Sequence, residues 1–297
     1  MRENTMFYNH SAFVNMLYFI VVMGMTMFFM HPAVLFISFI SSFSYSLYLG
    51  GAKSLKFSAG VLLPLLIFII ILNPLINHQG STILFYINNK MITKEAIYYG
   101  FFAGFMIIDM FLIFSSFNKI MTGDKIVYLF KGTIPKLSLM FSMTLRFIPR
   151  YKEEFNKIKA SQKCIGEGLD DGNIFDRIRH GVNIISALIT FALEDGIDSA
   201  NTMVARGYEL KGKSSYKNEK FTNVDKVLLI FMMIIIVILI MGIYNNAFHI
   251  IFFSDFSFTS IGGSNIIYFI SYLIFAFIPL LIEIKEEIVW NLLKQKI

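Results

Sequence analysis

Basic residues are concentrated in one block of the sequence, with long apolar segments on both sides of it. Residues 118–222 hold 17 of the 26 lysines and arginines, and the flanking segments are dominated by Phe, Ile, Leu and Met. Membrane proteins retain Lys and Arg on the cytoplasmic side of the bilayer. The pattern therefore predicts a polytopic membrane protein in which residues 118–222 form a cytoplasmic insertion between two groups of spans.

The overall composition indicates the same class of protein. Hydrophobic residues make up 56% of the chain and charged residues 15%, with a mean hydropathy of +0.64. An ordinary soluble domain contains about 25% charged residues. The net charge of +6 is explained by cytoplasmic retention of Lys and Arg, so we expect the lipid bilayer and no nucleic acid as a partner.

Six apolar segments are long enough to cross a bilayer, since a span needs about 20 residues. They are residues 11–30, 33–49, 57–76, 95–117, 224–244 and 264–283. The connecting segments 77–94 and 245–263 hold few or no basic residues, so both termini and the basic block are expected to be cytoplasmic. We expect an all-α fold with about six transmembrane helices. Its parts are residues 1–117 with about four spans, the cytoplasmic region 118–222, and residues 223–297 with about two spans and a cytoplasmic tail.

The basic block is predicted to form two long helices. The first, Lys136–Lys163, is expected to be interrupted at Pro149, with an apolar half before the proline and an amphipathic half after it. The second is expected to begin at Asp176. Each helix ends near a glycine, Gly166 or Gly207, which can adopt the left-handed conformation that terminates helices.

Two basic motifs of this block each have two interpretations. Arg206, in the run Ala205-Arg206-Gly207, could pair bidentately with a carboxylate of another protein, or interact with the helix dipole without a partner. The junction with Arg146, Pro149 and Arg150 could contact lipid phosphates at the inner leaflet. Alternatively, it could form a bend that passes membrane motion to a cytoplasmic helix.

Asp109 is the one acidic residue well inside a predicted span. Charge inside a membrane is costly and often functional, so Asp109 has either a transport role or a helix-packing role through a hydrogen bond. The sequence contains no G-x-x-x-x-G-K-[ST], H-E-x-x-H or G-x-S-x-G motif. We therefore assign no catalytic, cofactor-binding or metal-binding residue.

Three runs together resemble a known family. They are NPLINHQG at Asn73–Gly80, LRFIPR at Leu145–Arg150, and VARGYEL at Val204–Leu210, which ends the second long helix. This combination resembles the transmembrane T component of energy-coupling factor transporters, the family that includes the cobalt-transport permease subunit. The resemblance is most specific over residues 118–208.

The resemblance implies two docking motifs of the Ala-Arg-Gly type, one at the end of each cytoplasmic coupling helix. Each is expected to bind one of two cytoplasmic ABC-type ATPases. The second motif matches unchanged as Ala205, Arg206 and Gly207. The first corresponds to Cys164, Ile165 and Gly166, and it lacks the arginine, although Lys163 lies next to it.

The implied function is that of a non-catalytic coupling subunit in the bacterial cell (inner) membrane. ATP hydrolysis by the partner ATPases would move the two helices, and the movement would reach a small membrane substrate-binding S component that delivers a vitamin or a transition-metal ion. The alternatives are a stand-alone secondary transporter, which needs paired intramembrane charges, and a lipid-handling membrane enzyme, which needs a catalytic cluster at the inner face.

Overall fold

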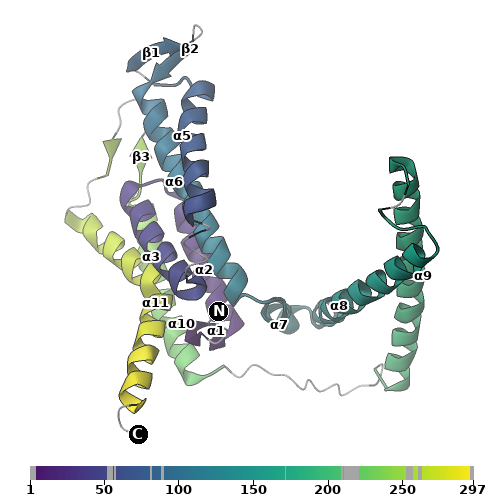
Figure 1. Ribbon diagram of the computed structural model, residues 1–297. Helices are drawn as coiled ribbons and strands as arrows, with labels where there is room; N and C mark the ends of the chain where they lie inside the picture. Colours follow the sequence, from purple (N-terminus) through teal and green to yellow (C-terminus); the bar gives the residue numbers. More distant parts are fainter. Residues whose placement is uncertain are drawn as a thin grey trace. The chain divides into compact units, whose positions relative to one another are not determined.

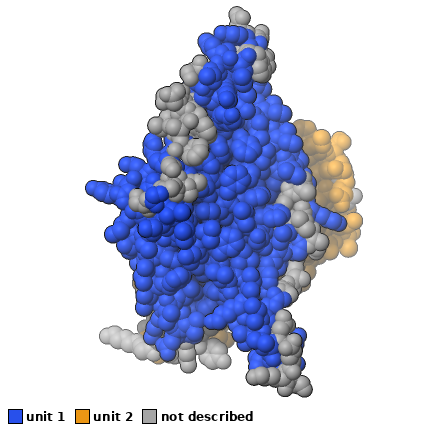
Figure 2. Space-filling view, turned by 90° about the vertical axis from the view of Figure 1, so that its left-hand side faces the viewer, with its two compact units in different colours: residues 1–122, 220–297 blue, residues 123–219 orange. Residues whose placement is uncertain are grey.

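The computed structural model separates into two compact units (Figures 1 and 2). It describes residues 5–51, 56, 58–80, 82–87, 90–170, 172–208, 210, 221–251, 257–259 and 263–294. The core unit comprises Met1–Thr122 and Lys220–Ile297, and the insert unit comprises Gly123–Glu219. The segment that connects the two parts of the core unit therefore forms a compact unit of its own.

The core unit is a bundle of apolar helices, which confirms the all-α polytopic fold. Its helices are α1 (Met6–Asn9), α2 (Ala12–Phe28), α3 (Pro32–Gly50), α5 (Leu63–Ile76), α6 (Lys94–Ile120), α10 (Asn223–Tyr244) and α11 (Ile266–Lys294), with short helical turns η1 (Ser58–Leu62) and η2 (Gly263–Asn265). Among the described residues, α3, α6, α10 and α11 are long and apolar enough to cross a membrane, and α2 and Gly60–Ile76 are shorter apolar helices. A helix thus occupies each of the six predicted spans.

The middle of the core unit is held by hydroxyl groups that bond to helix backbone. Pro279 lies inside α11 and has no N–H to donate to the Phe275 carbonyl. The carbonyl oxygen of the next residue, Ala276, accepts hydrogen bonds from the Tyr18 hydroxyl at 2.8 Å and from Ser41 Oγ at 2.6 Å. These two bonds tie α2 and α3 to α11.

Helices α5 and α6 approach each other closely at a glycine. A Cβ atom placed on Gly100 of α6 would lie 3.0 Å from Cβ of Asn73 on α5, closer than ordinary packing allows. Small residues at helix interfaces permit such close approach in membrane proteins. Asn73 begins the run NPLINHQG, so the start of this run lies in α5 and packs against α6, and residues 77–80 follow the end of the helix.

The connecting segments 77–94 and 245–263 contain short antiparallel hairpins that were not predicted from the sequence. β1 (Ile83–Ile87) pairs with β2 (Lys90–Thr93), and β3 (Ile250–Ile251) pairs with β4 (Ser257–Phe258). The base of the first hairpin is fixed by Glu95, whose carboxylate accepts hydrogen bonds from the backbone N–H of Thr82 at 3.2 Å and from its hydroxyl at 2.8 Å.

The insert unit consists of α7 (Gly123–Thr133), α8 (Pro135–Cys164) and α9 (Ile174–Ala205). α7 packs on α8, with a hydrogen bond from Ser138 Oγ to the Val127 carbonyl at 3.0 Å. Within the unit, α8 lies across α9 rather than parallel to it (Figure 1). The predicted interruption at Pro149 is wrong, because α8 continues as one helix through the proline.

The predicted ends of both long helices are confirmed, since α8 ends at Cys164 and α9 at Ala205. The second helix begins at Ile174, two residues before the predicted start. Asp176 accepts a hydrogen bond from the backbone N–H of Asn173 at 3.1 Å, which satisfies a donor at the helix start. Asp176 therefore stabilises the first turn of α9 and is not its first residue.

Candidate functional site

The end of α8 adopts a well-defined backbone geometry. Gly166 has φ of +84°, its N–H bonds to the Lys163 carbonyl at 3.1 Å, and the N–H of Glu167 bonds to the Gln162 carbonyl at 3.0 Å. These two bonds with a left-handed glycine constitute a Schellman motif. The motif leaves Ile165 as the last residue before the chain turns away from the helix axis.

The end of α9 repeats the same geometry. Gly207 has φ of +78°, its N–H bonds to the Val204 carbonyl at 2.9 Å, and the N–H of Tyr208 bonds to the Met203 carbonyl at 3.0 Å. Arg206 is then the last residue before the turn. The α8 end, defined as residues 162–167, and the α9 end, defined as residues 203–208, therefore match position by position.

The matched positions carry different side chains. Ile165 occupies the place of Arg206, Cys164 that of Ala205, and Lys163 that of Val204. Ile165 is 74% exposed, and Arg206 and the free thiol of Cys164 are also exposed. Within the described part of the chain, Arg206 forms no ion pair, so its guanidinium is available to a carboxylate.

The matched positions also show where Lys163 lies relative to Ile165, the residue that occupies the place of the docking arginine Arg206. Lys163 lies two positions before Ile165, and successive residues are separated by about 100° around a helix. Lys163 therefore projects from roughly the opposite side of α8. A cation at this position is not equivalent to Arg206 at the end of α9.

Arg150, one of the three predicted junction residues, connects the two long helices. Its Nη1 lies 2.6 Å from Oδ1 of Asp195 on α9, and its guanidinium carbon lies 5.8 Å from the ring centre of Phe191. Tyr151 meets the same Phe191 ring edge to face at 6.1 Å. Arg150 thus has a protein carboxylate as its partner at the crossing of α8 and α9.

The other two junction residues lie on the surface of α8. Arg146 and Pro149 are both exposed, and within the described part of the chain neither forms an ion pair with α9 as Arg150 does. The structure therefore brings one of the three predicted junction residues to the crossing. Asp195, which the sequence analysis did not single out, completes it.

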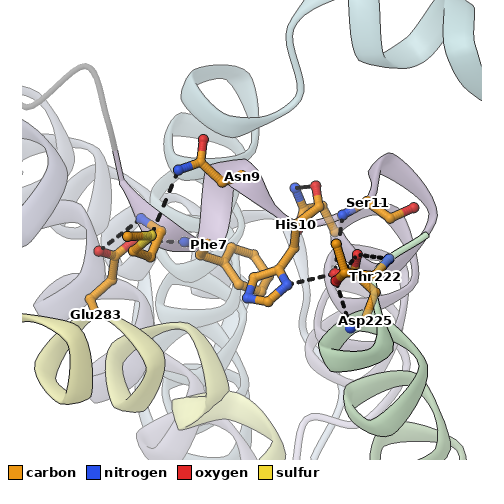
Figure 3. A network of polar contacts seen from close by, with 9 residues as sticks. Phe7, Asn9, His10, Ser11, Thr222, Asp225 and Glu283 are labelled. Atoms are coloured by element: carbon orange, nitrogen blue, oxygen red, sulfur yellow. Dashed lines mark hydrogen bonds and ion pairs between the residues drawn. The ribbon is translucent and has the colours of Figure 1, made fainter. Parts of the chain in front are cut away.

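A second polar network, also missed from the sequence, surrounds Asp225 in the core unit (Figure 3). Asp225 is 2% exposed and lies in the first turn of α10. Its Oδ1 lies 2.6 Å from Nδ1 of His10 and accepts the backbone N–H of Ser11, and its Oδ2 accepts the Thr222 hydroxyl at 2.7 Å. One carboxylate therefore joins the segment before α2 to the start of α10.

The same N-terminal segment is held from its other side by Glu283 of α11 (Figure 3). The carboxylate of Glu283 accepts the backbone N–H groups of Met6 at 3.2 Å and Phe7 at 3.1 Å. Phe7 is fully buried and its ring meets Tyr18 and Tyr45 edge to face at 5.5 and 6.3 Å. We call the contacts of Asp225 and Glu283 with residues 6–11 the N-terminal clasp.

Asp109 is fully buried in α6 and bonds to α3. Its Oδ1 accepts a hydrogen bond from Ser42 Oγ at 2.5 Å. This contact supports the helix-packing interpretation of Asp109. Among the described residues, no group of three or more His, Cys, Asp and Glu side chains lies close enough together to hold a metal ion.

Comparison with known proteins gives consistent matches. A family model described as "CbiQ: Cobalt transport protein" matches residues 9–216. The energy-coupling factor transporter transmembrane protein EcfT of Streptococcus thermophilus is 26% identical over 198 residues, which are 62% of this chain and 70% of that protein. EcfT of Staphylococcus aureus is 32% identical over 119 residues (40% of this chain), and EcfT of Listeria innocua 33% over 114 (38%). These two matches span 44% and 42% of the relatives' own lengths.

Proposed function

The chain belongs to the cobalt transport protein (CbiQ) family, and on this premise we propose that it is the transmembrane component of an energy-coupling factor transporter. In this role it has no chemical step of its own. It is a multi-pass subunit of the bacterial cell membrane with both termini in the cytoplasm. Its task is to carry motion from cytoplasmic ATPases to a membrane substrate-binding subunit.

The observation that carries this proposal is the pair of matching helix ends in the insert unit. Each places one exposed side chain, Ile165 or Arg206, at the point where a rigid helix stops. A planar guanidinium in such a fixed place can bind a carboxylate through two parallel hydrogen bonds. We propose that the α8 end and the α9 end each dock on one ABC-type ATPase.

The crossing of α8 and α9 supports a mechanical role. Arg150 and Asp195 form an ion pair at the crossing, reinforced by the cation–π contact of Arg150 with the Phe191 ring and the edge-to-face contact of Tyr151 with the same ring. Since packed helices move as rigid elements, displacement of one docked end is transmitted to the other helix. The motion would then reach the S component, which carries the vitamin or transition-metal ion.

Co-purification tests the docking role of Arg206. The tagged full-length chain is purified from its native membranes in mild detergent, and ATPase subunits are quantified by mass spectrometry. Arg206→Glu places a carboxylate where the partner's carboxylate is expected, so ATPase recovery falls at least about tenfold. Arg179→Glu, at another exposed arginine of α9, is the control and retains ATPase. Equal recovery with Arg206→Glu and wild type contradicts the docking role.

A further inference from the structure

The carboxyl group of Asp109 has one oxygen that the protein leaves unsatisfied. The side chain is fully buried in α6, and its Oδ1 accepts the Ser42 hydroxyl of α3 at 2.5 Å. Its second oxygen, Oδ2, has no hydrogen-bond partner among the described residues. An ionised carboxylate at this place would keep a full negative charge inside the bundle with half of its accepting capacity unused, which is strongly unfavourable.

The helices that pack on α6 provide no positive charge to compensate a carboxylate. α2, α3 and α5 contain no charged residue. On α6 itself the nearest charged residue is Lys119, about 15 Å further along the helix axis. The titratable side chains that face Asp109 are Tyr18 of α2 and Tyr272 of α11, and phenols are neutral near pH 7. Within the described part of the chain, Asp109 therefore lies in an uncharged environment.

From this arrangement we infer that Asp109 is a proton-binding site, whose carboxyl group is a neutral carboxylic acid near neutral pH. The proton is on Oδ2, and Oδ1 remains the acceptor of the Ser42 hydroxyl. A neutral carboxyl group is far less costly to bury than a carboxylate, so the bound proton stabilises the contact between α3 and α6. This inference is independent of the docking role proposed for the helix ends.

A proton fits the site better than a metal ion does. Hard cations such as Ca²⁺ and Mg²⁺ take about six or more oxygen ligands. Around Asp109, α3 and α6 are continuous helices, so their backbone carbonyls accept hydrogen bonds from their own helices. The remaining oxygens of α3 beside this carboxyl are serine hydroxyls, which are too few to enclose a cation.

The bound proton also affects the packing of α11, because α3 contacts both neighbours through one row of hydroxyls. Ser38 lies one turn before Ser42 on the same face of α3, is fully buried, and hydrogen-bonds to the Tyr272 hydroxyl of α11. Ser41 donates to the Ala276 carbonyl of α11 at 2.6 Å. A negative charge at Asp109 would act on this row, so loss of the proton should loosen α3 from α6 and α11 together.

Infrared spectroscopy detects the proton directly, because a carboxylic acid has a carbonyl stretching band that a carboxylate lacks. Spectra of the purified full-length chain in detergent near neutral pH are compared with those of Asp109→Asn. The variant is expected to lose one such band. Asp198→Asn, at an exposed aspartate of α9, is the control and should lose none.

Two infrared results would overturn the inference. One is a spectrum in which Asp109→Asn removes no carboxylic acid band. The other is a carboxylate band that disappears in Asp109→Asn and shifts when Na⁺ is exchanged for K⁺, which would identify a bound cation in place of the proton.

Thermal unfolding over a pH series gives a second measurement. The unfolded chain releases the Asp109 proton above about pH 4, whereas the folded chain retains it. The unfolding equilibrium constant of the wild type should therefore rise about tenfold per pH unit relative to that of Asp109→Asn. Asp198→Asn should follow the wild type.

The amide of Asp109→Asn resembles a neutral carboxyl group in shape and charge, so the variant should accumulate in the membrane and fold. Failure of Asp109→Asn to fold, or stability curves of wild type and Asp109→Asn that stay parallel over the pH series, would contradict a bound proton.

Discussion

Arg150 of α8 and Asp195 of α9 form an ion pair in which Nη1 and Oδ1 are 2.6 Å apart. The two partners differ in their surroundings, because the arginine side chain is 55% exposed and the aspartate side chain only 8%. Removing the arginine would leave a nearly buried carboxylate without a partner, which is more costly than losing a surface pair. The pair therefore fixes the crossing of the two long helices.

Arg150→Met is expected to destabilise the insert unit by about 1–3 kcal/mol, since the Asp195 carboxylate would lose its charged partner. Hydrogen exchange of the α9 peptides around Phe191, followed by mass spectrometry in detergent, measures the effect. Arg146→Met is the control, because Arg146 is an exposed arginine one turn earlier on α8. The fixed crossing is contradicted if both variants exchange at the same rate.

Asp225→Ala is expected to loosen the N-terminal clasp and lower the thermal unfolding temperature. His10, Ser11 and Thr222 would all lose this acceptor, and an unpaired donor at the buried Ser11 costs about 1–3 kcal/mol. A fluorescence-monitored thermal scan in detergent measures the change. Asp198→Ala, at an exposed aspartate of α9, should unfold at the wild-type temperature, and an equal loss in both variants would argue against the clasp.

Gly207→Ala should impair ATPase binding through the backbone alone. Its φ of +78° lies in the left-handed region, which costs an L-residue roughly 1–2 kcal/mol, so the variant shifts the orientation of Arg206. Gly196→Ala is the matched control, because Gly196 lies inside α9 with open space around it and alanine favours helix there. Co-purification of ATPase should fall for the first variant only, and unchanged recovery would show that the Schellman geometry is dispensable.

We expect the folded protein to lose stability on acidification because His31 would be protonated. Burial between α2 and α3 lowers the pKa of His31 below its ordinary value of 6.5. Its Nδ1 accepts the backbone N–H of Ala33 at 3.2 Å, and Nε2 contacts the Thr259 carbonyl at 3.2 Å, an arrangement that requires neutral imidazole. The unfolded chain binds the proton more readily, so this contribution is fully present above about pH 6.5 and is lost below it.

Thermal unfolding at a series of pH values from 8 to 5 tests this contribution. The wild type should lose stability below about pH 6.5 more steeply than His31→Asn, which keeps a polar side chain without a titrating group. Parallel curves for the two proteins would contradict a buried neutral His31. His249→Asn serves as the comparison for general effects of losing a histidine.

The helix ends were predictable because their signals are local. A glycine that follows an amphipathic run stops a helix through its own backbone freedom, and both Gly166 and Gly207 do so. The prediction at Pro149 failed because a proline removes one hydrogen bond without forcing a helix to end. Pro149 lies on an exposed face of α8, where solvent can satisfy the freed carbonyl.

The contacts that hold the helices together could not be predicted, because their partners are remote in the sequence. His10 and Asp225 are 215 residues apart, and Phe7 and Glu283 are 276 apart. A single sequence gives the chemical type of each residue, but it does not give which residues of two packed helices face each other. The apolar run Ile83–Ile87 illustrates a further limit, since five apolar residues fit a strand or a membrane-embedded turn equally well.

The composition of the complex formed by the wild-type chain tests the central claim most directly. The tagged protein is isolated from its native membranes in mild detergent, and every co-purifying protein is identified and quantified by mass spectrometry. The account predicts two ABC-type ATPases together with a small hydrophobic membrane protein, whose ligand reveals the transported substrate. Recovery of the folded chain alone would contradict a coupling role and would favour a self-contained transporter or membrane enzyme.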